Sequence, residues 1–331
     1  MSGEPVAIES DRLRVTVDPA VGGAITAIEH LGLGRSVLGK VPWTPVRSPA
    51  PPYAAPDEQS WLPHYTGGWP ILFPNGGDAC EFEGVFHGFH GEASLAPWEV
   101  TKAGATLRLS RRFAAVPVEM DRELVVEGDV LSIRERLVMR GVRPVKAMWG
   151  HHATFGSDLL AGPFEVQAAP CRALIDDRYD PPANPLRPGA EGRWPRLPGK
   201  DGAYDLSRPE GKVAAQVYLL DFAQPWLAIR RLDVSLAVAL SWDATVFPCA
   251  WLWYELGATD DPPWFGKGRL IGLEPNSSWP GNGLADVARR RARLVTLQPG
   301  GELRSWVRLH VFKPKGAILG VDENGRALPR S

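Results

Sequence analysis

Residues 86–100 read FHGFHGEASLAPWEV and place His87, His90 and Glu92 within six positions of one another. Histidine is scarce in this chain, with 7 in 331 residues, so two of them beside a carboxylate stand out. Imidazole gives or takes a proton near neutral pH, and imidazole with carboxylate also binds zinc, iron or manganese. The cluster therefore predicts proton transfer or a metal site, with packing in a polar turn as the structural alternative.

Two further polar clusters lie in apolar or Gly-rich surroundings. Residues 148–156, MWGHHATFG, contain His151 and His152, and residues 270–283, LIGLEPNSSWPGNG, contain Glu274 at the end of an apolar run. Neighbouring residues on a strand point to opposite faces, so only one of the two histidines can face a site. The apolar flank of Glu274 predicts partial burial, and an unpaired buried carboxylate is costly. We expect Glu274 and a histidine of either cluster to form a general acid/base pair.

The spacing of the first cluster argues against a metal site. A cupin-type site needs HxH with a glutamate several residues later, whereas here the spacing is HGFH with Glu92 two residues after His90. The zinc motif HExxH does not occur either. A metal-dependent isomerase using His87, His90, Glu92 and His152 stays open as an alternative, but the spacing favours proton transfer.

Alternation of apolar and polar residues, the period of a half-buried strand, dominates the chain. Only residues 285–295, ADVARRRARLV, carry a helical pattern, which predicts a short helix. About a dozen strands with hardly any helix predict an all-β fold, a large antiparallel β-sandwich. The alternating segments are 12–18, 105–113, 122–128, 130–141, 212–222, 226–233, 234–242, 250–256, 269–275, 292–298 and 303–312.

Two long segments, 40–70 and 177–210, are too rich in proline for regular strands. We expect them to be connections, and connections this long inside a compact domain are more often functional walls or lids than idle insertions. Strand alternation resumes with the same character after the second segment. We therefore predict a single domain over residues 1–331.

Composition limits the classes of function. Lys plus Arg number 37 and Asp plus Glu 38, a net charge of −1, so no basic excess points to nucleic acid or an anionic membrane. Cys80, Cys171 and Cys249 are far apart and lack CxxC spacing, which favours reduced thiols in a cytoplasm. The N-terminus has no signal-peptide pattern, and no apolar run approaches the ~20 residues of a membrane span. We expect a soluble cytoplasmic protein without nucleic-acid or membrane partners.

Several residues have side chains suited to holding a sugar. The 13 tryptophans have flat apolar faces that suit a core and equally suit stacking on a sugar ring. Trp253 shares a strand face with Glu255 in AWLWYEL, and Trp264 lies in the loop sequence DPPWFGKG. Asn75 and Asp78, in the Gly-rich turn NGGD, offer hydrogen bonds to hydroxyls or form an Asx turn.

Four segments occur in the order of the signature blocks of the galactose mutarotase-like, or aldose 1-epimerase, family: LFPNGG, HGEASLAPWEV, GHHATFG and LEPNSS. The resemblance extends over residues 10–312. His90 stands eight residues before Trp98, as in a bacterial branch with an HG block before a PW. His152 matches the histidine of the family's NHxYF block, and Glu274 matches the carboxylate of its LEP block.

The resemblance implies a β-supersandwich that binds a sugar in a cleft on one sheet and uses no cofactor. Glu274 would take the proton of the anomeric hydroxyl while His152 donates one to the ring oxygen, and His90 would hydrogen-bond a nearby oxygen. The ring would then open and close on either face, which interconverts α and β anomers. The implied partner is a small-molecule sugar, and the implied assembly is a monomer or homodimer.

The chain departs from the family pattern at two positions. Gly76 follows Asn75 where the better-studied mutarotases have an arginine, and Thr154 replaces the tyrosine of NHxYF. Either Asp78 or His87 would then take over hydrogen bonding to the sugar, or the sugar would differ. A non-catalytic carbohydrate-binding protein on the same fold is the alternative that these departures leave open.

Overall fold

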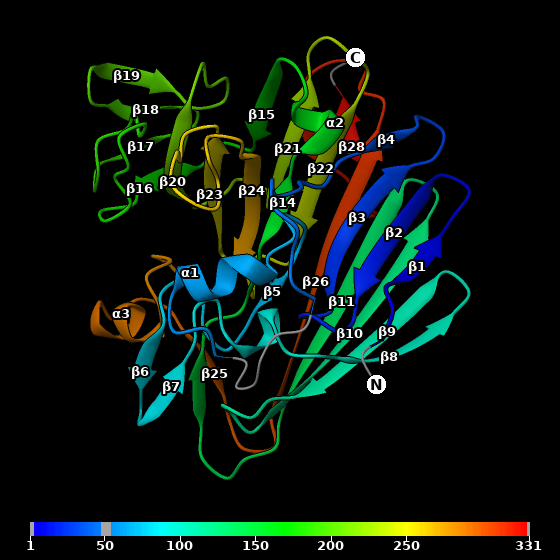
Figure 1. Ribbon diagram of the computed structural model, residues 1–331, viewed down its shortest axis with the longest axis vertical. Helices are drawn as coiled ribbons and strands as arrows, with labels where there is room; N and C mark the ends of the chain where they lie inside the picture. The colour runs from blue at the N-terminus through cyan, green and yellow to red at the C-terminus, as the bar shows by residue number, and fades with distance from the viewer. Residues whose placement is uncertain (1–2, 48–53, 330–331) are drawn as a thin grey trace.

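The computed structural model describes residues 3–47 and 54–329, and within them antiparallel sheets predominate (Figure 1). One large sheet has eight strands and the other has ten. The eight-stranded sheet has the order β15 (Phe164–Ala168), β21 (Trp226–Arg231), β22 (Ala237–Trp242), β26 (Glu302–Phe312), β11 (Val130–Met139), β10 (Val118–Glu127), β9 (Thr106–Arg112) and β8 (Glu99–Ala103).

The ten-stranded sheet carries the site described below, and we call it the long sheet. Its order is β19 (Gly202–Asp205), β18 (Arg196–Gly199), β17 (Glu191–Arg193), β16 (Arg172–Ile175), β20 (Val213–Leu220), β23 (Cys249–Leu256), β24 (Arg269–Asn276), β13 (Gly150–His151) and β5 (Ile71–Leu72), with β14 (Ala153–Phe155) also paired to β24.

Smaller sheets and short helices complete the described chain. The strands are β1 (Val6–Glu9), β2 (Leu13–Asp18), β3 (Ala24–His30) and β4 (Arg35–Ser36) in one sheet, and the pairs β6 (Cys80–Phe82) with β7 (Val85–His87), β12 (Val145–Ala147) with β25 (Val295–Leu297), and β27 (Ile318–Val321) with β28 (Ala327–Pro329). The helices are α1 (Glu58–Trp61), α2 (Ser157–Leu160) and α3 (Leu284–Arg289), with 3₁₀ turns η1 (Leu62–His64) and η2 (Glu92–Ser94).

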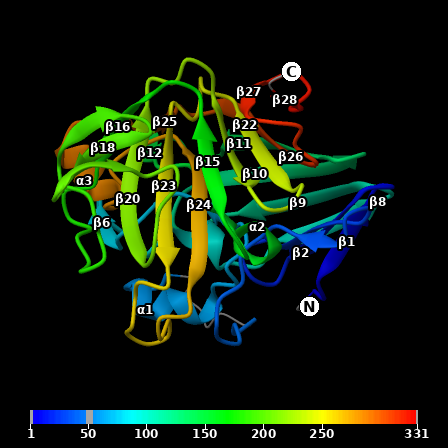
Figure 2. The same cartoon turned by 90° about the horizontal axis from the view of Figure 1, so that it is seen from above.

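The two large sheets pack their inner faces over one hydrophobic core. On β23, Ala250, Leu252 and Tyr254 enter this core, whereas Trp251 and Trp253 lie on the opposite face because side chains alternate along a strand. The outer face of the long sheet is therefore available for a site. Helix α1 lies beside β23 and β24 in both views of the ribbon (Figures 1 and 2).

The structure confirms the all-β sandwich, and every alternating segment contains a strand. It also confirms a short helix at the start of residues 285–295, where α3 lies. The expectation that residues 177–210 form only a connection is wrong, because β17, β18 and β19 lie there. The proline of β18, Pro198, lies where β18 has no partner on β17, because those two strands pair only at Arg193 and Arg196. Of the segment 40–70, residues 48–53 lie outside the described residues.

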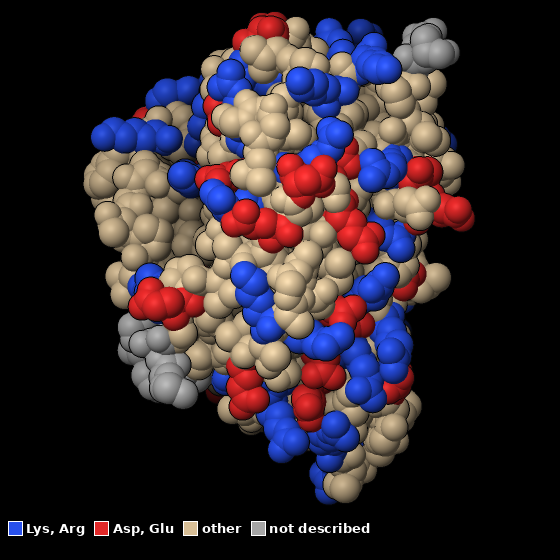
Figure 3. Space-filling view, turned by 90° about the vertical axis from the view of Figure 1, so that its right-hand side faces the viewer, with Lys and Arg blue, Asp and Glu red and all other residues tan. Residues whose placement is uncertain are grey.

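Charged side chains of both signs intermingle on the side of the molecule shown in Figure 3. Some form cross-strand ion pairs, such as that of Glu123 on β10 with Arg108 on β9 and Arg134 on β11. The mixture agrees with the net charge of −1. Among the described residues, no helix has both the length and the apolar character that crossing a membrane requires.

Candidate active site

A cavity of about 400 Å³ lies on the outer face of the long sheet. Its floor comes from β20, β23 and β24, and α1 with η1 and the β23–β24 connection provide walls. Both proline-rich segments contribute to its lining, Trp61 and Tyr65 from the first and Tyr179 from the second. These connections are therefore walls of the cavity, as their length suggested.

Glu274 lies on β24 and faces the cavity with its carboxyl group beside the backbone of Gly272. A Cβ atom at Gly272 would lie 2.1 Å from Glu274 Oε1, so glycine leaves room for the carboxyl group. The residue is only 2% exposed, and no described residue donates a hydrogen bond to it. This burial raises the pKa of Glu274 well above its ordinary value.

His152 lies at the break between β13 and β14, across from Glu274 on β24. Its Nε2 is 3.8 Å from Glu274 Oε1. Its Nδ1 is 2.9 Å from the hydroxyl of Thr154, which accepts a hydrogen bond from Tyr65 at 2.6 Å and donates one to the His152 carbonyl at 3.5 Å. This network assigns the imidazole proton to Nδ1, because the Thr154 hydroxyl oxygen then accepts hydrogen bonds from the Tyr65 hydroxyl and from His152 Nδ1. The other ring nitrogen, Nε2, then faces the carboxyl group of Glu274 with its lone pair.

Glu274 and His152 can share one exchangeable proton, although their facing atoms, 3.8 Å apart, lie beyond hydrogen-bond distance. Burial lowers the pKa of His152 to about 4 and raises that of Glu274, so burial disfavours the charged form of both groups. A neutral carboxyl beside a neutral imidazole satisfies both tendencies. Transfer of that one proton to Nε2 gives the carboxylate–imidazolium form without uptake from solution.

His90 is held by reciprocal hydrogen bonds with the backbone of Gly77. The His90 N–H donates to the Gly77 carbonyl at 2.9 Å, and the Gly77 N–H donates to His90 Nδ1 at 3.0 Å. Because Nδ1 accepts, the neutral ring carries its proton on Nε2 and can donate it to a ligand. Burial, and secondarily the nearby His152, lowers the pKa of His90 well below its ordinary value. The two imidazole centroids are 5.2 Å apart, and both rings line the cavity.

His151 points to the opposite side of the long sheet from His152. Trp69 donates its indole hydrogen bond to His151 Nδ1 at 3.1 Å, and His151 Nε2 lies 3.3 Å from Glu135 Oε2 in the core. The alternation expected for neighbouring strand residues therefore holds here, and His152 is the histidine that faces the cavity.

The residues expected to bind substrate divide into two groups. Asp78, Trp253 and Trp264 line the cavity, whereas Asn75 and His87 do not. The Asn75 side chain is fully buried, donates to the carbonyls of Asp78 and Gly88, and accepts from the Leu284 N–H, so it holds loops together behind the cavity. His87 is buried on β7, in register with Cys80 on β6. Neither side chain is placed to contact a ligand directly.

The structure does not assemble the four residues of the metal alternative. The carboxylate of Glu92 pairs with Arg111 at 2.7 Å and accepts the backbone N–H groups of Ala114 and Ala115. Glu92 is thus a structural residue of η2. Across residues 3–47 and 54–329, no three His, Cys, Asp or Glu side chains converge as a metal site requires.

Sequence reasoning missed Asp176 and Tyr218, which also line the cavity. Asp176 accepts hydrogen bonds from the N–H groups of Arg178 and Tyr179, each at 2.7 Å, and from the Tyr218 hydroxyl. The signal for Tyr218 was its phase on β20, where it shares the outer face with Gln216. Asp176 follows the end of β16, a position that the pattern alone does not distinguish from an ordinary turn.

Aromatic rings surround the two cavity-facing histidines. Trp61 stacks on Tyr65 with centroids 4.7 Å apart and meets His90 edge-on at 4.8 Å. Trp253 lies 5.9 Å from His152 and 6.1 Å from Trp264, measured between ring centroids. His90 and His152 therefore lie in an enclosure with flat aromatic faces, which suit stacking on an apolar ring face.

Comparison with known proteins gives matches of fold. Neither a protein-family model nor a curated protein sequence matches this chain. The Slr1438 protein from Synechocystis sp. PCC 6803 is 20% identical, with a TM-score of 0.64 over 94% of this chain and 96% of that chain. A provisionally named aldose 1-epimerase from Escherichia coli K12 is 14% identical, with a TM-score of 0.64 over 94% and 99%. A galactose mutarotase related enzyme from Lactobacillus acidophilus is 15% identical, with a TM-score of 0.60 over 94% and 98%.

The chain therefore has the galactose mutarotase-like sandwich fold, as its sequence blocks suggested. Identities this low establish the architecture and leave the chemistry to be argued from the residues of this chain.

Proposed function

We propose that this protein is a sugar mutarotase of the aldose 1-epimerase type, interconverting the α and β anomers of an aldose or sugar derivative. The observation that carries the proposal is the 3.8 Å separation of His152 Nε2 and Glu274 Oε1 on the wall of one cavity. In a cyclic sugar, the ring oxygen and the anomeric hydroxyl are bonded to the same carbon. A proton donor and acceptor at this separation can reach both oxygens of one bound ring.

The reaction moves two protons within the bound complex. Starting from the carboxylate–imidazolium form, Glu274 takes the anomeric hydroxyl proton while His152 gives its Nε2 proton to the ring oxygen. The bond between that oxygen and the anomeric carbon breaks, which yields the open-chain aldehyde. Rotation about the bond between C1 and C2 and closure on the other face reverse both transfers. A positioned acid and base typically contribute about 10²–10⁴-fold each.

The remaining groups orient the sugar and stabilise charge. His90 donates from Nε2 to an oxygen near the reacting carbon, because its Nδ1 is occupied by the Gly77 N–H. Trp253 and Trp264 offer faces for the ring, and Asp78 accepts hydrogen bonds from hydroxyls. No cofactor enters this mechanism. The unpaired state of Cys80, Cys171 and Cys249 supports a cytoplasmic location, which stays a prediction.

Exchange NMR between the α and β anomers of a sugar tests the proposal. Wild-type protein is expected to accelerate exchange above the spontaneous rate, and Glu274→Gln to abolish the acceleration while leaving sugar binding detectable. Glu302→Gln is the matched control, since Glu302 lies on β26 of the other sheet with its side chain 41% exposed. If the wild type binds sugars without accelerating exchange, the protein is a carbohydrate-binding protein instead.

A further inference from the structure

The cavity lining is rich in carboxyl groups. Five of the residues that line it are acidic, namely Glu58, Asp78, Asp176, Glu255 and Glu274, and burial raises the pKa of Glu58, Asp78 and Glu274. Among the described residues that line it there is neither lysine nor arginine, and the sequence of residues 48–53, SPAPPY, contains none. An anionic group entering this cavity would therefore meet carboxylates and no lining cation.

Two of these carboxyl groups accept several hydrogen bonds. Glu255, 1% exposed, accepts the N–H groups of Ala258 and Thr259 and the Thr259 hydroxyl. Asp176, 2% exposed, accepts two backbone N–H groups and the Tyr218 hydroxyl. Donors aimed at a carboxylate stabilise its charged form. Their charges act through a partly enclosed space, where screening by salt is weaker than at an open surface.

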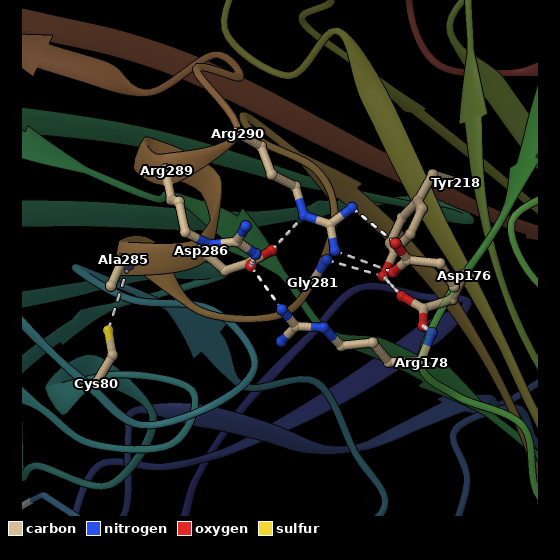
Figure 4. Close-up of polar contacts among 10 residues, drawn as sticks. Cys80, Asp176, Arg178, Tyr218, Gly281, Ala285, Asp286, Arg289 and Arg290 are labelled. Carbon is tan, nitrogen blue, oxygen red and sulfur yellow. Dashed lines mark hydrogen bonds and ion pairs between the residues drawn. The ribbon is translucent and has the colours of Figure 1, made fainter.

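Three arginines, Arg178, Arg289 and Arg290, pair with acidic side chains (Figure 4), and none of them lines the cavity. Arg178, two residues after Asp176, reaches Asp286 on α3 with Nη2 2.7 Å from Oδ1. Arg290 reaches the other oxygen of the same carboxylate at 2.6 Å and also pairs with Asp177 at 2.8 Å. The arginines thus fasten α3 to the loop after β16.

From this distribution of charge we propose that the site selects its sugar by charge: it accepts uncharged sugars and amino sugars and rejects phosphorylated or carboxylated ones. This substrate class rests on the proposed function, because it concerns the cavity that contains Glu274 and His152. A hydroxyl or an ammonium group donates hydrogen bonds to carboxylates, whereas a phosphate or a second carboxylate is repelled by them.

The test compares one sugar frame carrying different charges. The probes are D-glucose, D-glucosamine, D-glucose 6-phosphate and D-glucuronate, with the same set built on D-galactose. Catalysed exchange is measured above the spontaneous rate of each sugar at about pH 6, where the amine is protonated. We expect kcat/KM for the neutral and amino sugars to exceed that for the anionic ones at least about tenfold, with the gap narrowing as salt is added.

Variants distinguish the effect of the acidic lining residues from that of the arginines that pair with Asp286. The double variant Glu58→Gln/Asp78→Asn removes two carboxyl groups from the cavity lining. It is expected to raise kcat/KM for the anionic sugars and so to reduce the difference from the neutral and amino sugars. Arg178→Gln is expected to leave the preference unchanged. Equal or faster exchange of the phosphorylated sugar by the wild type overturns charge selection while the proposed function stands. If Arg178→Gln loses exchange of the phosphorylated sugar, the arginines form an anion site, and selection by charge is overturned as well.

If no sugar shows catalysed exchange, the proposed function is wrong, but selection by charge can still be tested by binding. Equilibrium dialysis with the same probes then decides it. Binding of the neutral and amino sugars with weaker binding of the anionic ones supports selection by charge. Equal or tighter binding of the anionic sugars overturns it.

Discussion

A histidine next to a glutamate occurs on both sides of the long sheet, with opposite electrostatic character. In the core, His151 Nε2 lies 3.3 Å from Glu135 Oε2, and Arg122 Nε lies 2.7 Å from the other oxygen of that carboxylate. In the cavity, His152 Nε2 lies 3.8 Å from Glu274 Oε1, and no described cation contacts that carboxyl group. The residue types are alike, so the difference lies in how far neighbouring groups compensate the charge of each carboxylate.

The pKa values of the two carboxyl groups follow this compensation. Burial alone would raise the pKa of Glu135, but His151 and Arg122 outweigh it and lower the value to about 2. Burial acts unopposed on Glu274 and raises its pKa well above the ordinary value. A compensated carboxylate holds its charge and serves stability, whereas an uncompensated one is ready to exchange a proton. Under the proposed function, the absence of a compensating cation beside Glu274 matters as much as the presence of His152.

The largest expected effect of breaking this contrast is on catalysis. Glu274→Gln should lower the enzyme-catalysed rate of anomer exchange about 10²–10⁴-fold, because the amide cannot take a proton. Glu135→Gln, the same change across the sheet, should leave the rate of the folded protein within about threefold, since its pair does not face the cavity. Exchange NMR on both variants, at a temperature where each is folded, measures the difference. A Glu274→Gln protein as active as wild type would refute the assignment.

Stability should respond to the same two changes in the opposite way. Glu135→Gln removes the partner of Arg122, whose side chain is fully buried, and should cost about 3–5 kcal/mol in the free energy of unfolding. Glu274→Gln replaces a carboxyl group that is unfavourable as an anion, so at neutral pH the variant should be at least as stable as wild type. Urea unfolding near pH 7 tests both. Destabilisation by Glu274→Gln comparable to that of Glu135→Gln would contradict the comparison.

The pH dependence of stability separates the two carboxyl groups further. The folded pKa of Glu135 lies below its ordinary value of 4.5, so its contribution is present above that value and is lost as pH falls toward about 2. A shift of this size corresponds to about 3 kcal/mol. The folded pKa of Glu274 is raised, so the cost of ionising it is absent below 4.5 and grows as pH rises. Unfolding free energies of wild type and each Gln variant between about pH 3 and pH 8 should show these opposite trends.

Replacing each histidine in turn sharpens the contrast at neighbouring positions. His152→Asn should reduce the catalysed rate about 10²-fold with little change in stability, because a general acid is lost from the cavity wall. His151→Asn should lower the free energy of unfolding and leave the rate of the folded protein nearly unchanged. Exchange NMR and urea unfolding on both variants give the comparison. If His152→Asn and His151→Asn lower the catalysed rate equally, the loss reflects disturbed packing of the sheet and not the loss of a proton donor.

Much of this contrast was predictable from sequence. The period-2 pattern located the strands, and it required His151 and His152 to face opposite ways. The apolar run before Glu274 predicted partial burial, and the residue is buried more deeply than that, at 2% exposed. The order of the sequence blocks indicated the fold. Which histidine faces the cavity depends on how β13 and β14 pair with β24, and that pairing is a long-range property.

Other features depend on contacts that local sequence does not encode. The partners of Glu135, namely Arg122 and His151, come from β10 and β13, and their meeting requires both sheets. Asn75 looked like a ligand residue because it lies in a Gly-rich turn, yet its hydrogen bonds reach Gly88 and Leu284. A pattern indicates that a polar side chain needs partners, but it does not say whether they belong to the protein or to a ligand.

The smallest expected effect concerns the groups that orient the two histidines. Tyr65→Phe removes the donor to Thr154 while keeping the ring that stacks on Trp61. Because one hydrogen bond is worth about 0.5–1.5 kcal/mol, kcat should fall no more than about tenfold, with KM unchanged. Trp69→Phe, its counterpart in the core, removes the donor to His151 and should change the free energy of unfolding without changing kcat. If Tyr65→Phe alters stability alone, as Trp69→Phe is expected to, then Thr154 and Tyr65 belong to the packing of the cavity wall and do not set the proton of His152.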